Sequence, residues 1–415
     1  MTGRSAHDPA APKEQESSLS SRSRVIASLL VLGLAGACVA NQPPGDAGAG
    51  TATIAVESSA TECKVASTEA PSGTISFSVR NSGADVTEFY LLAEDGLRVI
   101  SEIENVGPGL TRDLVVRVGP GTYVTACKPG MVGDGIRSAF TVKDSGVAIE
   151  PSGDVAQQLT EAETSYVAYV KDQAGSLIAG TKAFAEAYTA GDDALARELY
   201  PDVRVHWERI EPVAESFGDL DPLLDAREAD LAAGDTWSGW HYLEKDLWPP
   251  SQDANGGATY EAMTPAERVA ATTDLVTWTE RLVTQVNAED FTFEAFQISN
   301  GAKELLDEVA SGKVTGEEEI WSHTDLWDFQ ANVDGAWVAF EVLRDVAESE
   351  DPELAATLTT RFDELNALLA EHGSIEEGFS SYDELTTAEV QALAAAVDAV
   401  GEPLSRLTTT ITGAG

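Results

Sequence analysis

A histidine and a glutamate one helical turn apart are the residues of this chain best suited to hold a metal ion. The segment Trp237–Trp248 reads Trp-Ser-Gly-Trp-His-Tyr-Leu-Glu-Lys-Asp-Leu-Trp. Wound as a helix at about 100° per residue, it places its tryptophans and Leu247 on one face, with His241 and Glu244 in the middle. Burying a carboxylate without a partner is costly, so Glu244 needs one. A metal ion and a buried His–Glu pair both meet that need.

The spacing of this pair is not specific by itself. With 70 acidic residues among 415 and five histidines, a His-x-x-acid match is expected by chance. The weight therefore rests on the aromatic face, from which Tyr242, Lys245 and Asp246 are expected to point away. Ferritin-like bundles bind iron with Glu-x-x-His pairs at this spacing, in the reverse order.

Further acidic residues in the second half of the chain are candidate ligands. Glu211 lies at the edge of an apolar helix face, next to Pro212, where the helix is expected to bend. Asp221 and Asp225 share a helix face at i, i+4, and a solvated acidic surface is the alternative for Asp221. Carboxylate and imidazole ligands suit iron, manganese or zinc. The weaker candidates are His206, His323 and Asp328.

Two cysteines in the first half of the chain form a second candidate site. Cys63 and Cys127 have Glu88 and Met131 as companions, and no histidine occurs between residues 8 and 205. A blue-copper site needs imidazole beside the thiolate, so that type of site is excluded. Two readings stay open: a Cys63–Cys127 disulfide, natural in an exported protein, and a thiolate–carboxylate site for copper or iron.

The elements that would position these residues fall into two regions. Residues 51–150 contain short alternating runs such as Thr74–Val79, separated by turn formers, which predicts a β-sandwich. Residues 151–415 have helical spacing and predict an all-α bundle. One predicted helix runs on to Phe217 with Glu208 and Glu215 away from its apolar side, and another opens at Thr315. The second is expected to use Glu318 in a capping box.

The N-terminus and the charge limit the possible locations and partners. Residues 1–37 resemble a signal peptide whose apolar run ends just before Cys38, and Leu34–Cys38 resembles a lipobox, so Cys38 is the expected lipid anchor. Residues 38–50 are the expected linker. The net charge of -44 repels phosphate backbones, which excludes nucleic acid as a partner. The mature chain is expected outside the cytoplasm, as a cell-surface, periplasmic or secreted protein.

Several long blocks resemble the EfeO family, the extracytoplasmic component of the EfeUOB iron-uptake system. They include Thr-Glu-Phe-Tyr-Leu-Leu from Thr87, Tyr-Val-Thr-Ala-Cys-Lys-Pro-Gly-Met from Tyr123, and Gly-Trp-His-Tyr-Leu-Glu-Lys-Asp-Leu-Trp from Gly239. Ser-His-Thr-Asp-Leu-Trp-Asp-Phe from Ser322 is another. The blocks occur in the expected order and cover nearly everything after the linker.

The resemblance implies a cupredoxin-like domain at 51–150 followed by an imelysin-like helical domain at 151–415. It implies a non-enzymatic protein that captures Fe2+ or Fe3+ and delivers it to an EfeU-like permease, with an EfeB-like haem peroxidase as a further partner. In the second domain the implied iron ligands are His241, Glu244, Glu211 and Asp225. In the first they are Cys63, Glu88, Cys127 and Met131, for copper or iron.

Two other classes of function remain as alternatives. Imelysin-like domains are grouped with peptidases, so a metallopeptidase is one of them. No His-Glu-x-x-His motif occurs in the sequence to support it. The other is a non-catalytic surface lipoprotein in which the tryptophan face is simply part of the core.

Overall fold

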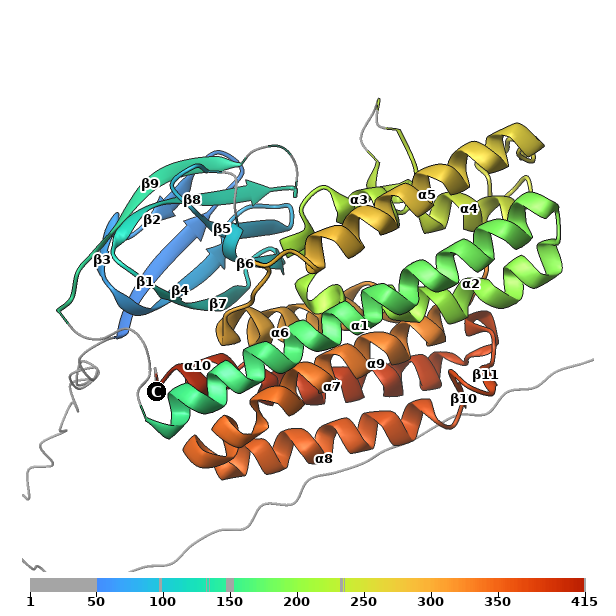
Figure 1. Ribbon diagram of the computed structural model, residues 1–415. Coiled ribbons are helices and arrows are strands. Elements are labelled where there is room, and N and C mark those ends of the chain that lie inside the picture. Colours follow the sequence, from blue (N-terminus) through green and yellow to red (C-terminus); the bar gives the residue numbers. More distant parts are fainter. Residues whose placement is uncertain are drawn as a thin grey trace, which may run out of the picture. The chain divides into compact units, whose positions relative to one another are not determined.

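The computed structural model describes residues 51–96, 99–131, 133, 135–146, 153–231, 234 and 236–413. The predicted signal peptide, Cys38 and the linker up to residue 50 lie outside the described residues, as does the predicted domain boundary at residue 150. A β region is followed along the chain by a mostly helical region (Figure 1). Among the residues that the structure describes, no helix is long and apolar enough to cross a bilayer.

The β region consists of two sheets that share one core. The first has the order β2 (Cys63–Val65), β1 (Thr51–Ser58), β4 (Gly73–Asn81), β7 (Thr111–Val118). The second has the order β3 (Glu69–Pro71), β9 (Ile136–Lys143), β8 (Gly121–Pro129), β5 (Thr87–Leu92), β6 (Val99–Val106). Phe77 of the first sheet lies 5.1 Å from Phe89 and 5.4 Å from Phe140 of the second, measured between ring centroids. The predicted β architecture is therefore present, while its relation to cupredoxins stays a prediction.

The helical region is built on long helices, each of which buries one apolar face. The long helices are α1 (Asp154–Ala190), α2 (Asp193–Glu208), α5 (Pro265–Val286), α6 (Ala295–Ser311), α7 (Asp325–Glu350), α8 (Pro352–Leu369) and α9 (Thr387–Leu404). The short elements are η1 (Glu211–Phe217), α3 (Leu220–Asp225), η2 (Glu228–Asp230), α4 (Trp240–Leu247), η3 (Lys313–Thr315), β10 (Gly373–Ser374), β11 (Gly378–Phe379), η4 (Tyr382–Glu384) and α10 (Leu407–Thr412). Helix α1 contacts α2, α5 and α7.

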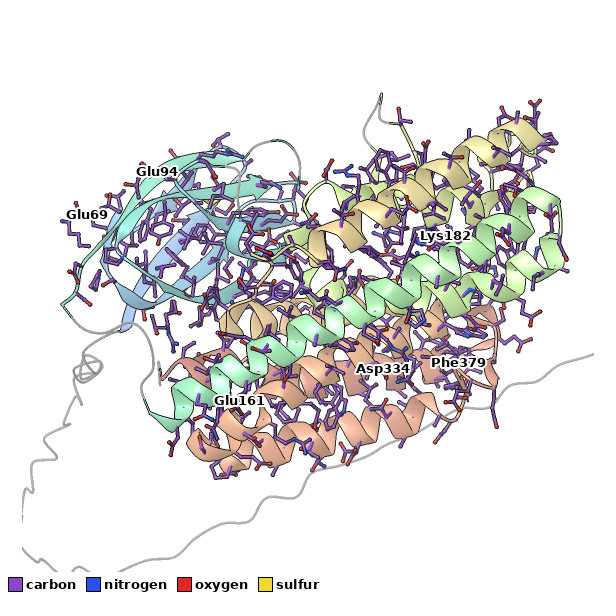
Figure 2. All side chains as sticks on the ribbon, in the orientation of Figure 1. Glu69, Glu94, Glu161, Lys182, Asp334 and Phe379 are labelled. Carbon is purple, nitrogen blue, oxygen red and sulfur yellow. A yellow bond between two sulfur atoms is a disulfide. The ribbon has the colours of Figure 1, made fainter. Side chains whose placement is uncertain are left out.

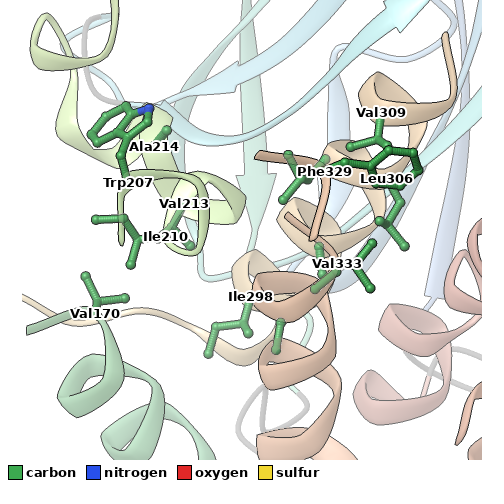
Figure 3. Close-up of a cluster of buried hydrophobic side chains, with 14 of the residues drawn as sticks. Val170, Trp207, Ile210, Val213, Ala214, Ile298, Leu306, Val309, Phe329 and Val333 are labelled. Atoms are coloured by element: carbon green, nitrogen blue, oxygen red, sulfur yellow. The ribbon is translucent and has the colours of Figure 1, made fainter. Parts of the chain in front are cut away.

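One continuous hydrophobic core joins these helices. Figure 3 shows a part of it, with Val170 of α1 and Ile210 on one side of the view and Phe329 and Val333 of α7 on the other. The predicted core face of α7 is confirmed, since its residues are all buried, namely Leu326, Phe329, Val333, Ala336, Phe340 and Leu343. Acidic side chains such as Glu69, Glu94 and Glu161 are exposed, in agreement with the high negative charge of the chain (Figure 2).

Two predicted helices differ from those observed. Helix α2 ends at Glu208, and a separate 3-10 helix with Pro212 in its first turn follows, so the proline starts a new element rather than bending an old one. Glu208 was expected to point away from the core but is fully buried. Thr315 belongs to the short η3, and α7 begins only at Asp325, so Glu318 does not cap a helix at Thr315.

The helix that carries the His–Glu pair is also shorter than predicted. It begins at Trp240, which leaves Trp237 in the preceding segment. Lys245 and Asp246 are buried rather than pointing away. Asp246 accepts hydrogen bonds from the Tyr188 hydroxyl at 2.6 Å and from the Met263 backbone N–H at 2.7 Å. These bonds tie α4 to α1 and to the segment before α5.

Candidate metal centre

His241 is enclosed by carboxylates from separate segments of the helical region. Its side chain is 2% exposed. The Nε2 atom lies 3.5 Å from Asp225 Oδ1 and 3.6 Å from Glu318 Oε1. The Nδ1 atom lies 3.4 Å from Glu244 Oε2 and 3.7 Å from Glu319 Oε1. Each ring nitrogen therefore faces a pair of carboxylates.

A close backbone contact brings α4 next to the end of α3. Gly239 has φ 90°, and a Cβ atom built on it would lie 2.1 Å from the carbonyl oxygen of Leu224. Only glycine allows both this conformation and this approach. Because Asp225 follows Leu224 and His241 follows Gly239 by two residues, the contact sets the carboxylate beside the imidazole. The Trp207 indole N–H donates to Asp225 Oδ2 at 2.8 Å and fixes its orientation.

The two ring nitrogens of His241 have different surroundings. At the Nδ1 side, Glu244 is anchored, because its Oε1 accepts the backbone N–H groups of Trp321 at 2.8 Å and Ser322 at 2.7 Å. At the Nε2 side the nitrogen is buried without a hydrogen-bond partner. Donor atoms of Asp225, His241 and Glu318 all lie within 4.8 Å of one another. Metal bonds of about 2.0–2.2 Å would fit between atoms at such separations.

A fully buried arginine neutralises part of the charge around this histidine. The guanidinium of Arg204 contacts Glu208 at 2.5 Å and Glu319 at 2.7 Å, and also forms an ion pair with Asp225. Asp328 lies 3.4 Å away, and Glu318 lies 4.0 Å away. Arg204 thereby joins α2, α3, α7 and the turn after η3 in one network.

A second buried cation links the network to Glu211. Lys313 Nζ lies 2.7 Å from Glu211, 3.1 Å from Glu208 and 3.7 Å from Glu318. The Asn332 side chain also donates to Glu211 Oε2 at 2.6 Å. Glu211 therefore contacts Lys313 and Asn332, and both of these also contact Glu208, which pairs with Arg204.

Carboxylates outnumber cations in this network. The cations are Arg204, Lys313 and Arg227, the last of which pairs with Glu318 at 3.3 Å. Seven carboxylates face them, namely Glu208, Glu211, Asp225, Glu244, Glu318, Glu319 and Asp328. Burial and the charge of Arg204 lower the pKa of His241, but contacts with Glu244 and Glu318 and the charge of Asp225 outweigh them and raise it to about 10. A proton on the imidazole thus balances charge that a bound cation could balance instead.

The two carboxylates that flank Nε2 of His241 line a cavity of about 470 Å³, which His241 itself does not line. Asp225, Glu318 and Glu211 line this cavity, whereas Glu244 and Glu319 do not. Ten acidic and two basic residues line it in all. The cavity therefore gives a cation access to Asp225 and Glu318, the two carboxylates beside this nitrogen.

The structure brings together three of the four residues predicted for this region. His241, Glu244 and Asp225 lie at one centre, and Glu211 is linked to it through Lys313, which also contacts Glu318. Asp328, a weaker candidate, joins the Arg204 network, and Asp221 lines the cavity. Neither of the other two weaker candidates lies at the centre: His206 pairs with Gln173 at 2.8 Å, and His323 adopts a positive φ of 59°.

Sequence reasoning missed the residues that come from buried polar positions elsewhere. They are Arg204, Glu208, Lys313, Glu318 and Glu319. A signal did exist for two of them, since Arg204 and Glu208 follow Tyr200 at i+4 and i+8 on an otherwise apolar helix face. An ionic pair at i, i+4 inside such a face requires further buried partners.

In the β region, Cys63 and Cys127 form a disulfide, with Cα atoms 5.5 Å apart. Of the two readings left open by the sequence, this structure has the disulfide, in which neither sulfur is a thiolate able to bind metal. Glu88 is buried and pairs with Lys128 at 3.5 Å and with the Tyr90 hydroxyl at 2.8 Å. Met131 is 42% exposed. With both cysteines in the disulfide, the metal-binding role of Glu88 and Met131 stays a prediction.

Comparisons with known proteins identify relatives of this chain. Residues 162–407 match the family model of imelysin, labelled peptidase M75. The chain is 35% identical over 350 residues to "Iron uptake system component EfeO" of Escherichia coli K12, covering 83% of this chain and 88% of that protein. The same values hold for the protein of that name in Shigella flexneri. A solved iron-regulated protein A precursor from Parabacteroides distasonis has 16% identity and a TM-score of 0.47, and the match covers 63% of this chain and 96% of that one.

Proposed function

This chain belongs to the EfeO family of iron-uptake components, and we propose that its helical region binds an iron ion through Asp225, His241 and Glu318. The observation that carries the proposal is the Nε2 atom of His241, which is buried without a hydrogen-bond partner between two carboxylates that line the acidic cavity. Imidazole with carboxylate is a suitable ligand set for Fe2+ or Fe3+.

Glu244 has a separate task in this proposal. One imidazole cannot direct both of its nitrogens at the same ion, so the Nδ1 side must serve another purpose. A histidine that binds metal usually donates its other N–H to a carboxylate, which fixes the ring and raises its basicity. Glu244, held by two backbone N–H groups, provides that carboxylate. The His-x-x-Glu motif thus supplies one ligand and the group that orients it.

The excess of carboxylates favours cation binding and makes the affinity depend on pH. Cation binding at Nε2 displaces the proton that otherwise balances the carboxylates, so affinity falls as the medium becomes more acidic. Asp225 and Glu318 are each paired with a permanent cation, Arg204 and Lys313. These ion pairs keep both carboxylates in place when no iron is bound.

We further propose that the protein acts outside the cytoplasm and hands its ion to an EfeU-like permease. The support is the name of its relatives, "Iron uptake system component", and the lipobox-like segment that ends at Cys38. An EfeB-like haem peroxidase is a further proposed partner. Iron is then cargo, not a resident cofactor.

Iron titration of matched variants tests the ligand assignment. We expect Glu318→Gln to weaken iron binding by at least the 10–100-fold typical of lesser, outer-shell changes, about 1.4–2.7 kcal/mol, and His241→Ala to abolish tight binding. Glu317→Gln is the control, because Glu317 is the adjacent residue and its side chain is 52% exposed. Isothermal titration under anaerobic conditions with Fe2+, repeated with a ferric chelate, gives affinity and stoichiometry. Unchanged binding in both His241→Ala and Glu318→Gln would refute the proposal.

A metallopeptidase is the second candidate, favoured by the family label of residues 162–407. It predicts cleavage of a peptide library by the metal-loaded protein and its arrest by a chelator. Absence of cleavage with iron, zinc and manganese loaded in turn removes it. Tightly bound iron in the purified protein would exclude the alternative of a surface lipoprotein that binds no metal.

A further inference from the structure

The β region and the helical region meet along α6. Asn300 donates to the Val115 carbonyl at 2.9 Å, and Gln297 donates to the Ile100 carbonyl at 3.3 Å. Arg112 of β7 forms an ion pair with Asp307. Phe296 packs into the hydrophobic core of the β region. The cavity that reaches Asp225 and Glu318 lies at this junction, because Tyr90 and Lys128 of the β region also line it.

Three carboxylates gather in this cavity without a basic partner. Donor oxygens of Glu102 and Glu104 from β6 and of Glu215 from η1 lie within 4.8 Å of one another. Among the described residues, no lysine or arginine lies within ion-pair distance of any of the three. The two basic residues of the cavity wall have other partners: Lys128 contacts Glu88 and the Tyr90 hydroxyl, and Arg227 pairs with Asp230 and Glu318.

The state of Glu102 points to a ligand. The residue is 3% exposed and lines the cavity, yet its Oε1 atom has no hydrogen-bond partner. A buried polar atom without a partner costs about 1–3 kcal/mol, more when charged, and natural proteins rarely leave one. A cation between the three carboxylates would satisfy this oxygen and neutralise the repulsion among them.

From this geometry we propose a second cation site, formed by Glu102, Glu104 and Glu215 at the junction of the two regions. Its ligands are all carboxylate oxygens, so it selects a hard cation that keeps several waters, in contrast to the imidazole-containing centre at His241. Because the same cavity is lined by Asp225 and Glu318, an ion held here has access to two proposed ligands of that centre.

The electrostatics of the cavity agree with a missing positive charge. Burial, together with the charges of Glu88, Glu308 and Asp221, raises the pKa of Glu104 to about 8. Burial and the charge of Asp221 also raise the pKa of Glu215 above its usual range. The carboxylates therefore stay ionised together only at the cost of mutual repulsion, which a cation removes.

Terbium luminescence of the full chain tests the site, with Tb3+ as a hard trivalent probe and excess Mg2+ to occupy weak surface positions. Tyr90, which lines the cavity, can sensitise the ion. We expect Glu102→Gln to lower the affinity for Tb3+, measured by titrating the sensitised luminescence, at least ten-fold. Glu94→Gln, an exposed glutamate of the same region, is the control and leaves it unchanged. Glu215→Gln, from the other region, gives the same loss as Glu102→Gln.

The His241→Ala variant separates this inference from the proposed iron centre. We expect it to lose tight iron binding and to keep the Tb3+ site, whereas Glu102→Gln keeps the iron centre. Loss of the Tb3+ signal in His241→Ala alone would overturn the second site, since the probe would then occupy the histidine centre. An equal response of Glu102→Gln and Glu94→Gln, or no response of either, would overturn it as well. Urea unfolding of each variant checks folding, and Glu102→Gln, which removes an unsatisfied charge, is expected to be no less stable than the wild type.

Discussion

Replacing Arg204 with methionine is expected to destabilise the metal-free protein by about 3–5 kcal/mol, the usual result of removing one partner from a buried ion pair. The guanidinium is fully buried, and Glu208 and Glu319, which it contacts, are fully buried too. Methionine fills a similar volume, so the loss comes from carboxylates left without their cation. Because several acidic groups lose the same partner, we expect a value in the upper part of that range.

The loss can be measured by urea unfolding of the metal-free protein, followed by tryptophan fluorescence. Arg281→Met is the matched control, since Arg281 pairs with Asp219 at 3.0 Å but both side chains are largely exposed. Exposed pairs contribute roughly 0–1 kcal/mol. We also expect iron to raise the unfolding midpoint of Arg204→Met, because a bound cation replaces part of the lost charge. A difference below about 1 kcal/mol between Arg204→Met and Arg281→Met would refute the view that the acidic centre depends on this cation.

Two further predictions concern stability. Burial and the charges of Asp225 and Glu308 raise the pKa of Asp221 from 3.8 to about 7, so its proton is held more tightly in the folded state and stability falls as pH rises from about 4 to 7. The free energy of unfolding of Asp221→Asn in urea is therefore expected to equal that of the wild type near pH 4 and to be larger at pH 8 by up to about 4 kcal/mol. Parallel pH profiles of the two proteins would contradict this. Gly301→Ala is expected to destabilise the protein, because its Cβ would lie 1.7 Å from the Pro212 carbonyl oxygen. Gly175→Ala, in an open stretch of α1, is expected to stabilise it by up to about 1 kcal/mol. The thermal unfolding midpoints of the two variants would then shift in opposite directions.

Local patterns in the sequence were enough to find the parts of the centre that lie on one short segment or one helix face. His241 and Glu244 are neighbours on α4, and Asp225 follows a short apolar run. The alternation of strands and the periodicity of α1 and α7 also follow from local patterns, because each element buries one face.

Long-range contacts explain what the sequence did not reveal. Glu318 fits a capping box from Thr315 as well as it fits a ligand, and only the packing of the following turn against Glu244 decides between them. Glu208 points inward, against the prediction, because Arg204 and Lys313 pair with its carboxylate inside the protein. The spacing of the cysteines could not distinguish a disulfide from a metal site either, because the outcome depends on how closely β2 and β8 approach each other.

The Cys63–Cys127 disulfide has a consequence for a protein that handles iron. Iron that cycles between its two oxidation states in the presence of oxygen generates peroxide and radicals, and free thiols are among the first groups to be oxidised by them. Within the part of the chain that the structure describes, both cysteines are already joined, so no sulfhydryl remains to be converted to sulfenic or sulfonic acid. The bond thus protects the β region from the chemistry of the proposed cargo.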